Sequence, residues 1–370
     1  MDTSPFDIRR AGNRPTEQDM LESLCQGLAY PPAALRALPA PPDAVKARAD
    51  ALVEVTCNNR TGRFAVEIKA SSTPRVVEQA AWQAKAASAG STRPMVMAPY
   101  LSEKALLRLR ESEVSGIDLS GNCVILGSSF TVWRSGAPNR CPESRPIMNP
   151  FSGDSSIIAR SFLLRPEYET LGALREFALS RLMLSRGPAA ASLTPGTASK
   201  VVRTLEEELI CARRDGAIRL SNPRELLDRL RKGYKAPAGP RLTGKTPLEP
   251  EAVWRRLAEA GPGGLRCAAT GTASAGRYGV LSSTEPLALY VSSLSAAASL
   301  LQVTETRAFP NITLVEARKN LFYFDTRPRG DAVWASPIQT WLELAQAGPR
   351  EQEGARALEQ PIVEGRAAEL

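Results

Sequence analysis

Hydrophobic and polar positions alternate between residues 54 and 69, where the chain reads as a strand, a turn and a second strand. The first strand carries Glu54, the polar turn lies near residues 58–62, and the second strand ends Val66-Glu67-Ile68-Lys69. Because side chains on a strand point to opposite faces in alternation, Glu67 and Lys69 are expected on the same face. The pattern therefore predicts a hairpin that presents an acidic and a basic side chain together.

Helical and strand patterns around this hairpin predict one α/β domain. Residues 31–42 are rich in Pro and Ala and read as a linker between the first helix and the hairpin. The elements expected from apolar spacing and helix-start residues are a helix at 17–28, a helix that begins near Pro74, a strand at 95–98, a helix at 103–110 and a strand pair within 117–133. Helices interleaved with strands indicate an α/β domain over residues 1–140.

Three helices and a basic hairpin are predicted in the middle of the chain. Residues 141–152 hold three prolines and little periodicity, so they mark a domain boundary. Helices are expected at 155–164, at 171–184 and from Thr194, where threonine is a suitable N-cap and the following proline a suitable first residue. Asp215-Gly216 is a strong signal for a two-residue hairpin turn. This order predicts a winged helix over residues 153–235.

The last third of the chain predicts an α+β domain over residues 250–350. A linker rich in Pro, Gly and Thr precedes it at 237–250. Its elements are expected as a helix at 251–260, strands at 288–291, 312–315 and 321–324, and a helix at 337–347. Residues 351–370 are charged and rich in Ala, and are expected to form a flexible tail. The predicted fold is thus multidomain: an N-terminal α/β domain, a central winged helix-turn-helix and a C-terminal α+β domain. The hairpin with Glu54, Glu67 and Lys69 makes the first domain resemble a restriction-endonuclease-like domain.

The chain of 370 residues contains no histidine, which excludes mechanisms that need an imidazole base or metal ligand. Carboxylates and lysine would have to carry any chemistry. The six cysteines include no Cys-x-x-Cys pair, so neither a zinc site nor a disulfide framework is predicted. With no leader-like start and no run of about 18 apolar residues, the sequence predicts a cytoplasmic protein with no membrane partner.

The net charge of +8 is concentrated in the middle of the chain. Between residues 151 and 235 there are 15 Lys and Arg side chains and 10 Asp and Glu side chains. Basic segments attract phosphate backbones without sequence preference. Arginine outnumbers lysine throughout, which a GC-rich genome alone also produces, so the charge supports a nucleic-acid partner only in part.

Glu54, Glu67 and Lys69 form a candidate metal-dependent catalytic site. Mg²⁺ prefers oxygen ligands and usually takes one or two protein carboxylates together with waters and a substrate phosphate. Glu54 and Glu67 would hold the ion if the strand register lets both face one cleft. Lys69 would then stabilise negative charge that develops at the scissile phosphate.

Gln83, on the helix after the hairpin, is a further candidate catalytic residue, and Glu17 or Glu22 of the first helix would complete the rim. These residues in this order resemble the PD-(D/E)XK nuclease-like fold over roughly residues 15–135. The resemblance implies a Mg²⁺-dependent deoxyribonuclease. The aspartate that this fold usually carries on the upstream strand is absent, and Glu54 takes its place only by its position in the chain. The alternative is that Glu67 and Lys69 lie on the solvated face of an ordinary amphipathic strand.

The helix that begins at Thr194 predicts a DNA-reading surface. In a winged helix this third helix lies in the major groove and the hairpin touches the backbone, so short polar and basic side chains are needed on its outer face. The candidate DNA-binding residues are Thr197, Ser199, Lys200 and Arg203 on the helix and Arg213, Arg214 and Arg219 on the hairpin. No cofactor is required for such binding. The alternative is a helical hairpin that packs against another domain and whose charges are merely solvated.

Four segments resemble the AbiEi-like antitoxin and transcriptional regulator family of type IV toxin-antitoxin systems. They are residues 98–102 (Ala-Pro-Tyr-Leu-Ser), 116–122 (Gly-Ile-Asp-Leu-Ser-Gly-Asn), 155–156 (Ser-Ser) and 335–344 (Ala-Ser-Pro-Ile-Gln-Thr-Trp-Leu-Glu-Leu). The resemblance implies binding to operator DNA, repression of the protein's own operon, and neutralisation of a nucleotidyltransferase-like toxin without necessarily binding it. The stretch from Asp118 to Asn122 also has a plain structural reading, because Asp, Gly and Asn suit a tight turn between strands.

The sequence as a whole predicts a sequence-specific DNA-binding transcriptional regulator. Double-stranded DNA is the expected partner, and a homodimer is expected because paired half-sites raise specificity. The alternative function is a Mg²⁺-dependent DNA endonuclease that uses Glu54, Glu67 and Lys69 and is targeted by the winged helix.

Overall fold

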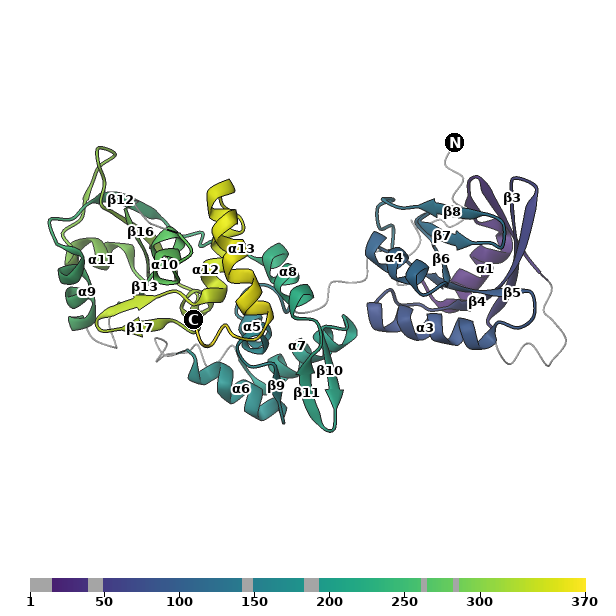
Figure 1. Cartoon of the computed structure of the whole chain (residues 1–370), viewed down its shortest axis with the longest axis horizontal. Coiled ribbons are helices and arrows are strands. Elements are labelled where there is room, and N and C mark those ends of the chain that lie inside the picture. The colour runs from purple at the N-terminus through teal and green to yellow at the C-terminus, as the bar shows by residue number, and fades with distance from the viewer. Residues whose placement is uncertain (1–14, 39–48, 142–148, 183–192, 261–264, 282–285) are drawn as a thin grey trace. The chain divides into compact units, whose positions relative to one another are not determined.

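The computed structural model describes residues 15–38, 49–141, 149–182, 193–260, 265–281 and 286–370 (Figure 1). The chain divides into two compact units, Met1–Pro146 and Ile147–Leu370. Both units combine helices with β-sheet, so the chain has the mixed α/β character that its hydrophobic pattern predicts.

An eight-stranded sheet forms the centre of the first unit, with its strands in chain order. The strands are β1 (Ala29–Tyr30), β2 (Ala33–Ala37), β3 (Ala51–Cys57), β4 (Arg60–Ile68), β5 (Thr92–Ala98), β6 (Ser115–Asp118), β7 (Cys123–Leu126) and β8 (Thr131–Arg134). The helices of this unit are α1 (Glu17–Gly27), α3 (Pro74–Ala87) and α4 (Glu103–Glu111). Strands β4, β5 and β6 are parallel and the other neighbours antiparallel. Since parallel neighbours need a crossover connection, α3 and α4 lie between these three strands in the sequence.

Helices cover both faces of this sheet (Figure 1). On one face, α1 buries Met20 and Leu24 in a core that includes Val66 and Ile68 of β4. On the other face, the buried alanines of α3 and leucines of α4 form a second core. Because alternate residues of a strand point to opposite faces, Glu67 lies on the side of α3 and α4.

The turn between β3 and β4 forms where the chain can take left-handed backbone angles. Asn58 and Asn59 have φ values of 48° and 59°, and asparagine tolerates this conformation better than most residues. The hairpin register that follows pairs Ala51 with Val66. The strand, turn and strand expected between residues 54 and 69 are therefore present.

Residues 31–42 are not a linker throughout, contrary to the interpretation from composition. Within this segment β2 pairs with β3 and buries Ala33 and Leu35, while residues 39–48 lie outside the described part of the chain. The strand was missed because it is only five residues long and adjoins a Pro-Pro pair, which gives periodicity little room to appear.

The second unit begins with helices and a three-stranded sheet in the order β10-β11-β9. Its first elements are α5 (Ser156–Leu164), β9 (Glu167–Tyr168), α6 (Leu171–Ser180), α7 (Pro195–Glu207), β10 (Cys211–Arg214), β11 (Ala217–Leu220) and α8 (Pro223–Gly233). Thr194 caps α7, because its side chain accepts a hydrogen bond from the backbone N–H of Thr197. Asp215 and Gly216 form the hairpin turn with φ values of 53° and 82°. The helix start and the turn agree with the sequence signals.

A seven-stranded sheet follows, in the order β15-β12-β16-β14-β13-β18-β17. Its strands are β12 (Arg241–Lys245), β13 (Cys267–Ala269), β14 (Leu287–Val291), β15 (Thr304–Glu305), β16 (Ile312–Glu316), β17 (Arg327–Arg329) and β18 (Ala332–Trp334). The associated helices are α9 (Pro250–Glu259), α10 (Gly271–Arg277), α11 (Leu294–Leu300), the 3₁₀ helix η3 (Asn320–Tyr323), α12 (Pro337–Leu344) and α13 (Pro349–Val363).

Residues 153–235 and 250–350, expected as separate domains, share one hydrophobic core. It includes Ile158 and Phe162 of α5 together with Phe322 of η3 and Trp341 of α12. The two segments therefore pack as a single body within the second unit.

Three expectations for this unit are wrong. Residues 351–370 are not a flexible tail: α13 covers most of them and buries Leu358 and Ile362 in the shared core. Residues 321–323 belong to the 3₁₀ helix η3 and Phe324 follows it, so the strand expected at 321–324 is absent; a short apolar run does not distinguish the two. Residues 237–250 are not a linker, because they contain strand β12, which pairs with β16.

All six cysteines are free thiols, in line with the absence of a disulfide pattern. In the described part of the chain, no helix is both long and apolar enough to cross a bilayer.

Candidate functional site

The end of β4 brings Glu67 and Lys69 into direct contact. The Lys69 Nζ atom donates a hydrogen bond to Glu67 Oε1 at 2.6 Å. The Glu67 side chain is 10% exposed and that of Lys69 22% exposed. The two side chains lie on one face, as the strand period predicts, and form a mostly buried ion pair rather than two separate solvated charges.

Asp50 lies beside this pair. Since Ala51 pairs with Val66 in the β3–β4 register, Asp50 is opposite Glu67. Its backbone N–H donates to the Val66 carbonyl at 3.1 Å, and its carboxylate accepts from the Ile68 N–H at 2.8 Å. The backbone of β4 therefore holds an exposed carboxylate next to Glu67 and Lys69. These three residues are called the sheet-end cluster below.

The charges of the sheet-end cluster act on one another. Burial lowers the pKa of Lys69, but the hydrogen bond and charge of Glu67, together with the charges of Asp50 and Glu17, outweigh burial and raise it. Lys69 is therefore a stable ammonium at neutral pH. The contribution of Glu17 indicates that the first turn of α1 adds a further carboxylate to the negative surroundings of this lysine.

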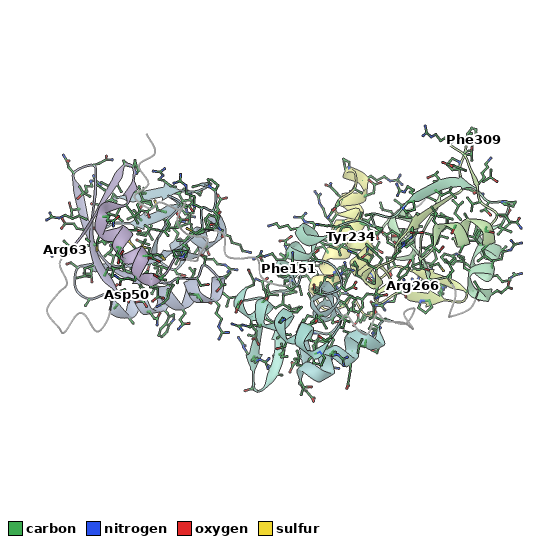
Figure 2. The ribbon with its side chains drawn as sticks, turned by 180° about the vertical axis from the view of Figure 1, so that it is seen from behind. Asp50, Arg63, Phe151, Tyr234, Arg266 and Phe309 are labelled. Carbon is green, nitrogen blue, oxygen red and sulfur yellow. The ribbon has the colours of Figure 1, made fainter. Side chains whose placement is uncertain are left out.

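Glu54 does not belong to this cluster. It pairs with Arg63 in the hairpin register, and its carboxylate lies 3.7 Å from Arg63 Nε. Four strand positions separate it from Asp50, a distance of about 13 Å at the usual rise of roughly 3.3 Å per residue. Figure 2 shows Arg63 and Asp50 at separate places on the first unit. In the structure, the carboxylate next to Glu67 is therefore that of Asp50 and not that of Glu54.

Strand β3 itself contains no aspartate, but the residue that precedes it supplies one. Asp50 stands directly before the first residue of β3, in a position that apolar alternation alone assigned to no strand. Only the register, with Ala51 opposite Val66, shows that the strand begins early enough to bring Asp50 to the end of β4.

Gln83 and Glu22 lie apart from the sheet-end cluster. Gln83 is exposed on α3, and the Glu22 carboxylate accepts a hydrogen bond from Gln18 at 2.9 Å. Among the described residues, no hydrogen bond or ion pair joins either side chain to Glu67 or Lys69. Of the two glutamates expected at the rim, only Glu17 influences the cluster.

The described residues contain no group of three or more His, Cys, Asp or Glu side chains arranged to hold a metal ion. The carboxylates of Asp50 and Glu67 are a smaller set. Magnesium usually takes one or two protein carboxylates and completes its shell with water and phosphate oxygens, so two carboxylates fit a substrate-assisted site but not a closed protein cage.

The outer face of α7 carries the polar residues that the sequence predicts for it. Ala198, Val201, Val202 and Leu205 are buried beneath the helix. On the other side, Ser199, Lys200 and Arg203 are exposed and Thr197 is half-buried. Within the described part of the second unit, Lys200 and Arg203 are therefore accessible to solvent.

The hairpin of β10 and β11 lies next to α7 (Figure 1). Arg213 and Arg214 are exposed on it, and Arg219 is partly exposed. Acidic neighbours accompany several of these cations: Arg203 pairs with Glu207 at 3.0 Å, Arg213 with Glu206 at 2.8 Å and Arg219 with Glu167 at 3.1 Å. Among the described residues, Lys200 and Arg214 form no such ion pair. The surface is thus basic but partly compensated by its own carboxylates.

The segment from Asp118 to Asn122 is a structural turn. One Asp118 carboxylate oxygen accepts from the backbone N–H groups of Ser120 and Asn122, and the other from Leu101 N–H and the Asn122 amide. Both oxygens are occupied and the residue is buried. The plain structural reading of this segment therefore holds.

Comparisons with protein-family models, with curated proteins and with solved structures each gave no match. The family resemblance carried by residues 98–102, 116–122, 155–156 and 335–344 stays a prediction. The geometry of the two sites is accordingly what bears on function.

Proposed function

We propose that residues 153–235 form a winged helix that binds double-stranded DNA, and that the protein is a sequence-specific transcriptional regulator. The element order helix, strand, helix, helix, strand, strand supports this proposal, as does the pairing of β9 with the hairpin strand β11. In such folds the third helix enters the major groove and the hairpin follows the phosphate backbone.

The observation that carries the proposal is the open polar face of α7. Lys200 is exposed and the Arg203 side chain is 80% exposed, while the apolar side of the helix is buried. Apart from the Arg203–Glu207 pair within the helix, these polar side chains have most of their surface exposed and are accessible to a ligand. Short residues such as Ser199 leave room for the close approach that base edges require.

The ion pairs of this surface are compatible with DNA binding. Exposed pairs contribute about 0–1 kcal/mol, because water screens them. Arg203 and Arg213 can therefore exchange Glu207 and Glu206 for phosphate or base oxygens at little expense. The acidic neighbours also disfavour nonspecific contacts, since every cation that leaves its carboxylate exposes a negative charge to the duplex.

The test is a gel-retardation or fluorescence titration of the full chain with the promoter fragment of its own operon. We expect the double variant Lys200→Ala, Arg203→Ala to bind roughly 100-fold more weakly, because each lost contact is worth about 1–3 kcal/mol. The matched control is Arg255→Ala, Arg307→Ala, which removes the same charge from exposed positions elsewhere in the second unit. Full binding by the first variant, or an equal loss in the second, would refute the assignment of α7.

Repression of its own operon, a homodimer on paired half-sites and neutralisation of a nucleotidyltransferase-like toxin are what the family resemblance implies. They belong to the same proposal. A promoter-reporter strain that carries the Lys200→Ala, Arg203→Ala variant tests the first of them, and derepression is the expected outcome.

A second candidate function, a Mg²⁺-dependent deoxyribonuclease, is favoured by Asp50. The sheet-end cluster supplies an aspartate, a glutamate and a lysine on neighbouring strands, the residue types that such a reaction uses. Asp50 and Glu67 would hold the cation, which would activate a water and bind the phosphate. Lys69 would stabilise charge on the phosphate oxygens. To do so it must release Glu67, to which it donates a short hydrogen bond.

The discriminating experiment is cleavage of supercoiled plasmid with Mg²⁺ or Mn²⁺. If the nuclease proposal is right, Asp50→Asn, Glu67→Gln and Lys69→Met each abolish nicking while DNA affinity is unchanged. Glu54→Gln is the matched control, because Glu54 lies on the same strand but outside the cluster. Absence of nicking by the wild-type chain with both cations, or loss of nicking in Glu54→Gln alone, rejects this candidate.

A further inference from the structure

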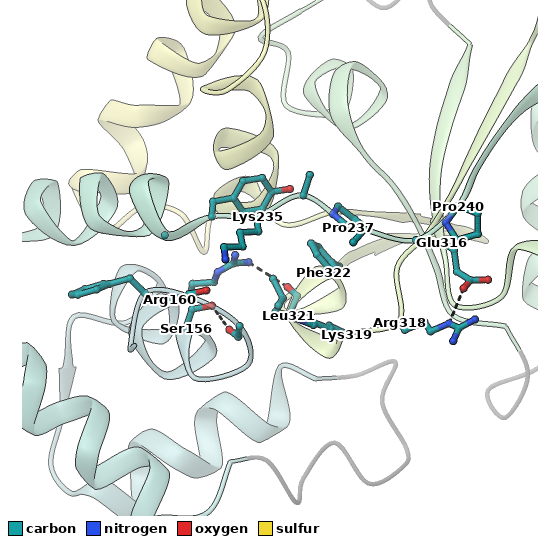
Figure 3. A pocket seen from close by; sticks show the side chains of 18 residues that line it. Ser156, Arg160, Lys235, Pro237, Pro240, Glu316, Arg318, Lys319, Leu321 and Phe322 are labelled. Carbon is teal, nitrogen blue, oxygen red and sulfur yellow. Dashed lines mark hydrogen bonds and ion pairs between the residues drawn. The ribbon is translucent and has the colours of Figure 1, made fainter. Parts of the chain in front are cut away.

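A cavity of about 470 Å³ lies in the second unit, between the first helices and the end of the large sheet (Figure 3). This volume is within the range of about 300–1,000 Å³ that is usual for small-molecule sites. One side is formed by α5 and the segment before it, the second by η3 and the end of β16, and the third by residues 234–240, which follow α8. None of the functions considered above uses this cavity.

The segment 234–240 is fixed at both ends by close backbone contacts. A Cβ atom on Gly233 would lie 2.5 Å from the Phe151 carbonyl oxygen, and one on Gly239 would lie 2.2 Å from that of Glu316. Only glycine permits these approaches. In addition, the Glu316 N–H donates to the Pro240 carbonyl at 2.9 Å. The wall of the cavity is therefore held in place before any ligand arrives.

Arg160 gives the cavity its chemical character. It extends from α5, is 2% exposed, and donates through Nη1 to the Gln339 side chain at 2.9 Å and to the Leu321 carbonyl at 3.3 Å (Figure 3). Its Nε atom is buried and has no hydrogen-bond partner. Among the described residues, this guanidinium forms no ion pair with a carboxylate. Burial lowers the pKa of Arg160 to about 10, so it is still charged at neutral pH.

A buried cation without an acidic partner is costly unless another group compensates it. In the described part of the chain, Arg160 is connected to the Glu343 carboxylate through Gln339, whose amide donates to Glu343 Oε1 at 2.6 Å. Burial raises the pKa of Glu343 despite its hydrogen bonds from Thr270, Gln339 and Gly271. This indirect contact leaves the positive charge of Arg160 incompletely matched.

The other charges at the cavity are also mainly positive. Lys235 and Lys319 line it and are exposed. The only carboxylate among the lining residues, Glu316, is already satisfied: it accepts from the Leu294 N–H at 2.9 Å and pairs with Arg318 at 2.7 Å. An anion that enters therefore meets three cations and one neutralised acid.

Aromatic and apolar side chains make up much of the remaining lining. They are Phe151, Tyr234, Pro237, Leu321 and Phe322. Rings beside cations suit a ligand that has both a planar group and a phosphate. We propose that this cavity binds a nucleoside monophosphate, with the phosphate near Arg160, Lys235 and Lys319 and the base against the aromatic side chains.

The position of the cavity connects it to the predicted DNA-binding surface. Its walls include α5 and the end of α8, and α5 packs in the same core as α7. A ligand that bridges the fixed segment 234–240 and Arg160 would shift α5, which shares its core with α7, so we expect occupancy to change DNA affinity. This regulatory step rests on the proposed function, whereas ligand binding itself does not.

Calorimetric titration of the full chain at low ionic strength tests the binding site. The probes are AMP, GMP, CMP and UMP. Phenyl phosphate, adenosine and inorganic phosphate are the comparison ligands, which separate the contribution of the ring to binding from that of the phosphate. We expect at least one nucleoside monophosphate to bind with a Kd of about 1 mM or lower, and adenosine and inorganic phosphate to bind at least tenfold more weakly. No binding by any of the four nucleotides overturns the proposal, as does equal binding of adenosine.

Variants of the two exposed lysines localise the ligand without threatening the fold. Lys235→Glu combined with Lys319→Glu is expected to weaken nucleotide binding at least tenfold. The matched control, Lys245→Glu with Arg255→Glu, reverses two exposed charges outside the cavity; at about 0.15 M salt, where the screening length is about 8 Å, it should leave binding within about twofold. Equal losses in both double variants would place the ligand elsewhere and reject the site.

Arg160→Met removes the buried charge while keeping a similar volume. Retained folding with lost nucleotide binding is the result expected of an anion site, and retained folding with unchanged binding contradicts it; if the variant unfolds, the lysine variants decide. A separate titration of promoter DNA with and without nucleotide measures the regulatory step. An unchanged DNA affinity there rejects regulation alone, because calorimetry reports the binding site independently.

Discussion

Two clusters of opposite charges, one in each unit, differ in how far water reaches them. In the second unit Asp325 is 1% exposed and accepts from Arg181 at 3.1 Å and from Arg327 at 2.8 Å, one oxygen for each arginine. These three residues are called the closed cluster here. The sheet-end cluster of the first unit has two carboxylates for one lysine, and Asp50 in it is exposed.

The same kinds of side chain thus have different roles in the two units, according to how fully their charges are matched. Burial raises the pKa of Asp325 in spite of its two arginines, so desolvation offsets much of the attraction between the charges. The intact closed cluster therefore adds little net stability, whereas removal of one partner leaves a buried charge unpaired and is strongly destabilising. The closed cluster joins the end of α6 to the segment before β17. In the sheet-end cluster Asp50 is exposed, so one of the two carboxylates of this cluster is accessible to a ligand from solvent, as a binding or catalytic site requires.

The largest expected effect is that of Asp325→Ala. Removing the carboxylate leaves Arg181 and Arg327 facing each other without a counter-charge, and we expect a loss of about 3 kcal/mol in the free energy of unfolding of the second unit. Urea denaturation followed by circular dichroism measures it. Asp331→Ala, at an exposed position in the turn before β18, is the control and should change stability by less than about 0.5 kcal/mol. Equal losses of stability in the two variants would show that Asp325 in the closed cluster contributes no more than an exposed aspartate.

A smaller effect is expected for Glu67→Ala. Glu67 is buried, but Lys69 is partly exposed and can reach water once its partner is removed, so we expect a loss of about 1 kcal/mol in the stability of the first unit. Chemical denaturation of the full chain, read through the transition of this unit, provides the value. Glu54→Ala should have an effect below about 0.5 kcal/mol, since its partner Arg63 is largely exposed. A loss for Glu67→Ala as large as that for Asp325→Ala would contradict the distinction between the clusters.

The smallest effect concerns pH. Because the folded chain raises the pKa of Lys69, the lysine contributes stability below its unfolded pKa of roughly 10.4, and this stability is lost as the pH rises through the higher folded value. Solvent screening limits the contribution to a few tenths of a kcal/mol. The measurement is the difference in unfolding free energy between wild type and Lys69→Met at pH 8 and at about pH 11. If this difference grew with pH, folding would lower the pKa of Lys69 instead of raising it, and the contacts assigned to Lys69 would be excluded.

Local signals predicted many elements well because their causes are local. Thr194-Pro195 begins α7 and Asp215-Gly216 turns the hairpin, as a cap residue, a proline in the first turn and positive φ angles require. The buried side of α7 followed from apolar spacing along the helix. The open state of its other side did not, since it depends on what the rest of the unit covers.

Errors arose where a long-range contact decides the structure. The tail after residue 350 is polar and Ala-rich, yet α13 packs in the core that α5 and α12 also form. Asp50 was overlooked because only the β3–β4 register brings it to Glu67. Arg160 carried no signal in the sequence, because its burial depends on η3 and α12, more than 150 positions further along the chain.

The sequence by itself determined the periodic elements, the absence of imidazole chemistry and the placement of Glu67 and Lys69 on one strand face, since each depends on residues close together in the chain. The tertiary structure decided which acid stands beside that pair, that the middle and last segments share one core, and that a cavity encloses an unmatched arginine. The physical reason is that register and burial are set by contacts between distant segments, and these contacts determine whether a charge is solvated, paired or available for a ligand.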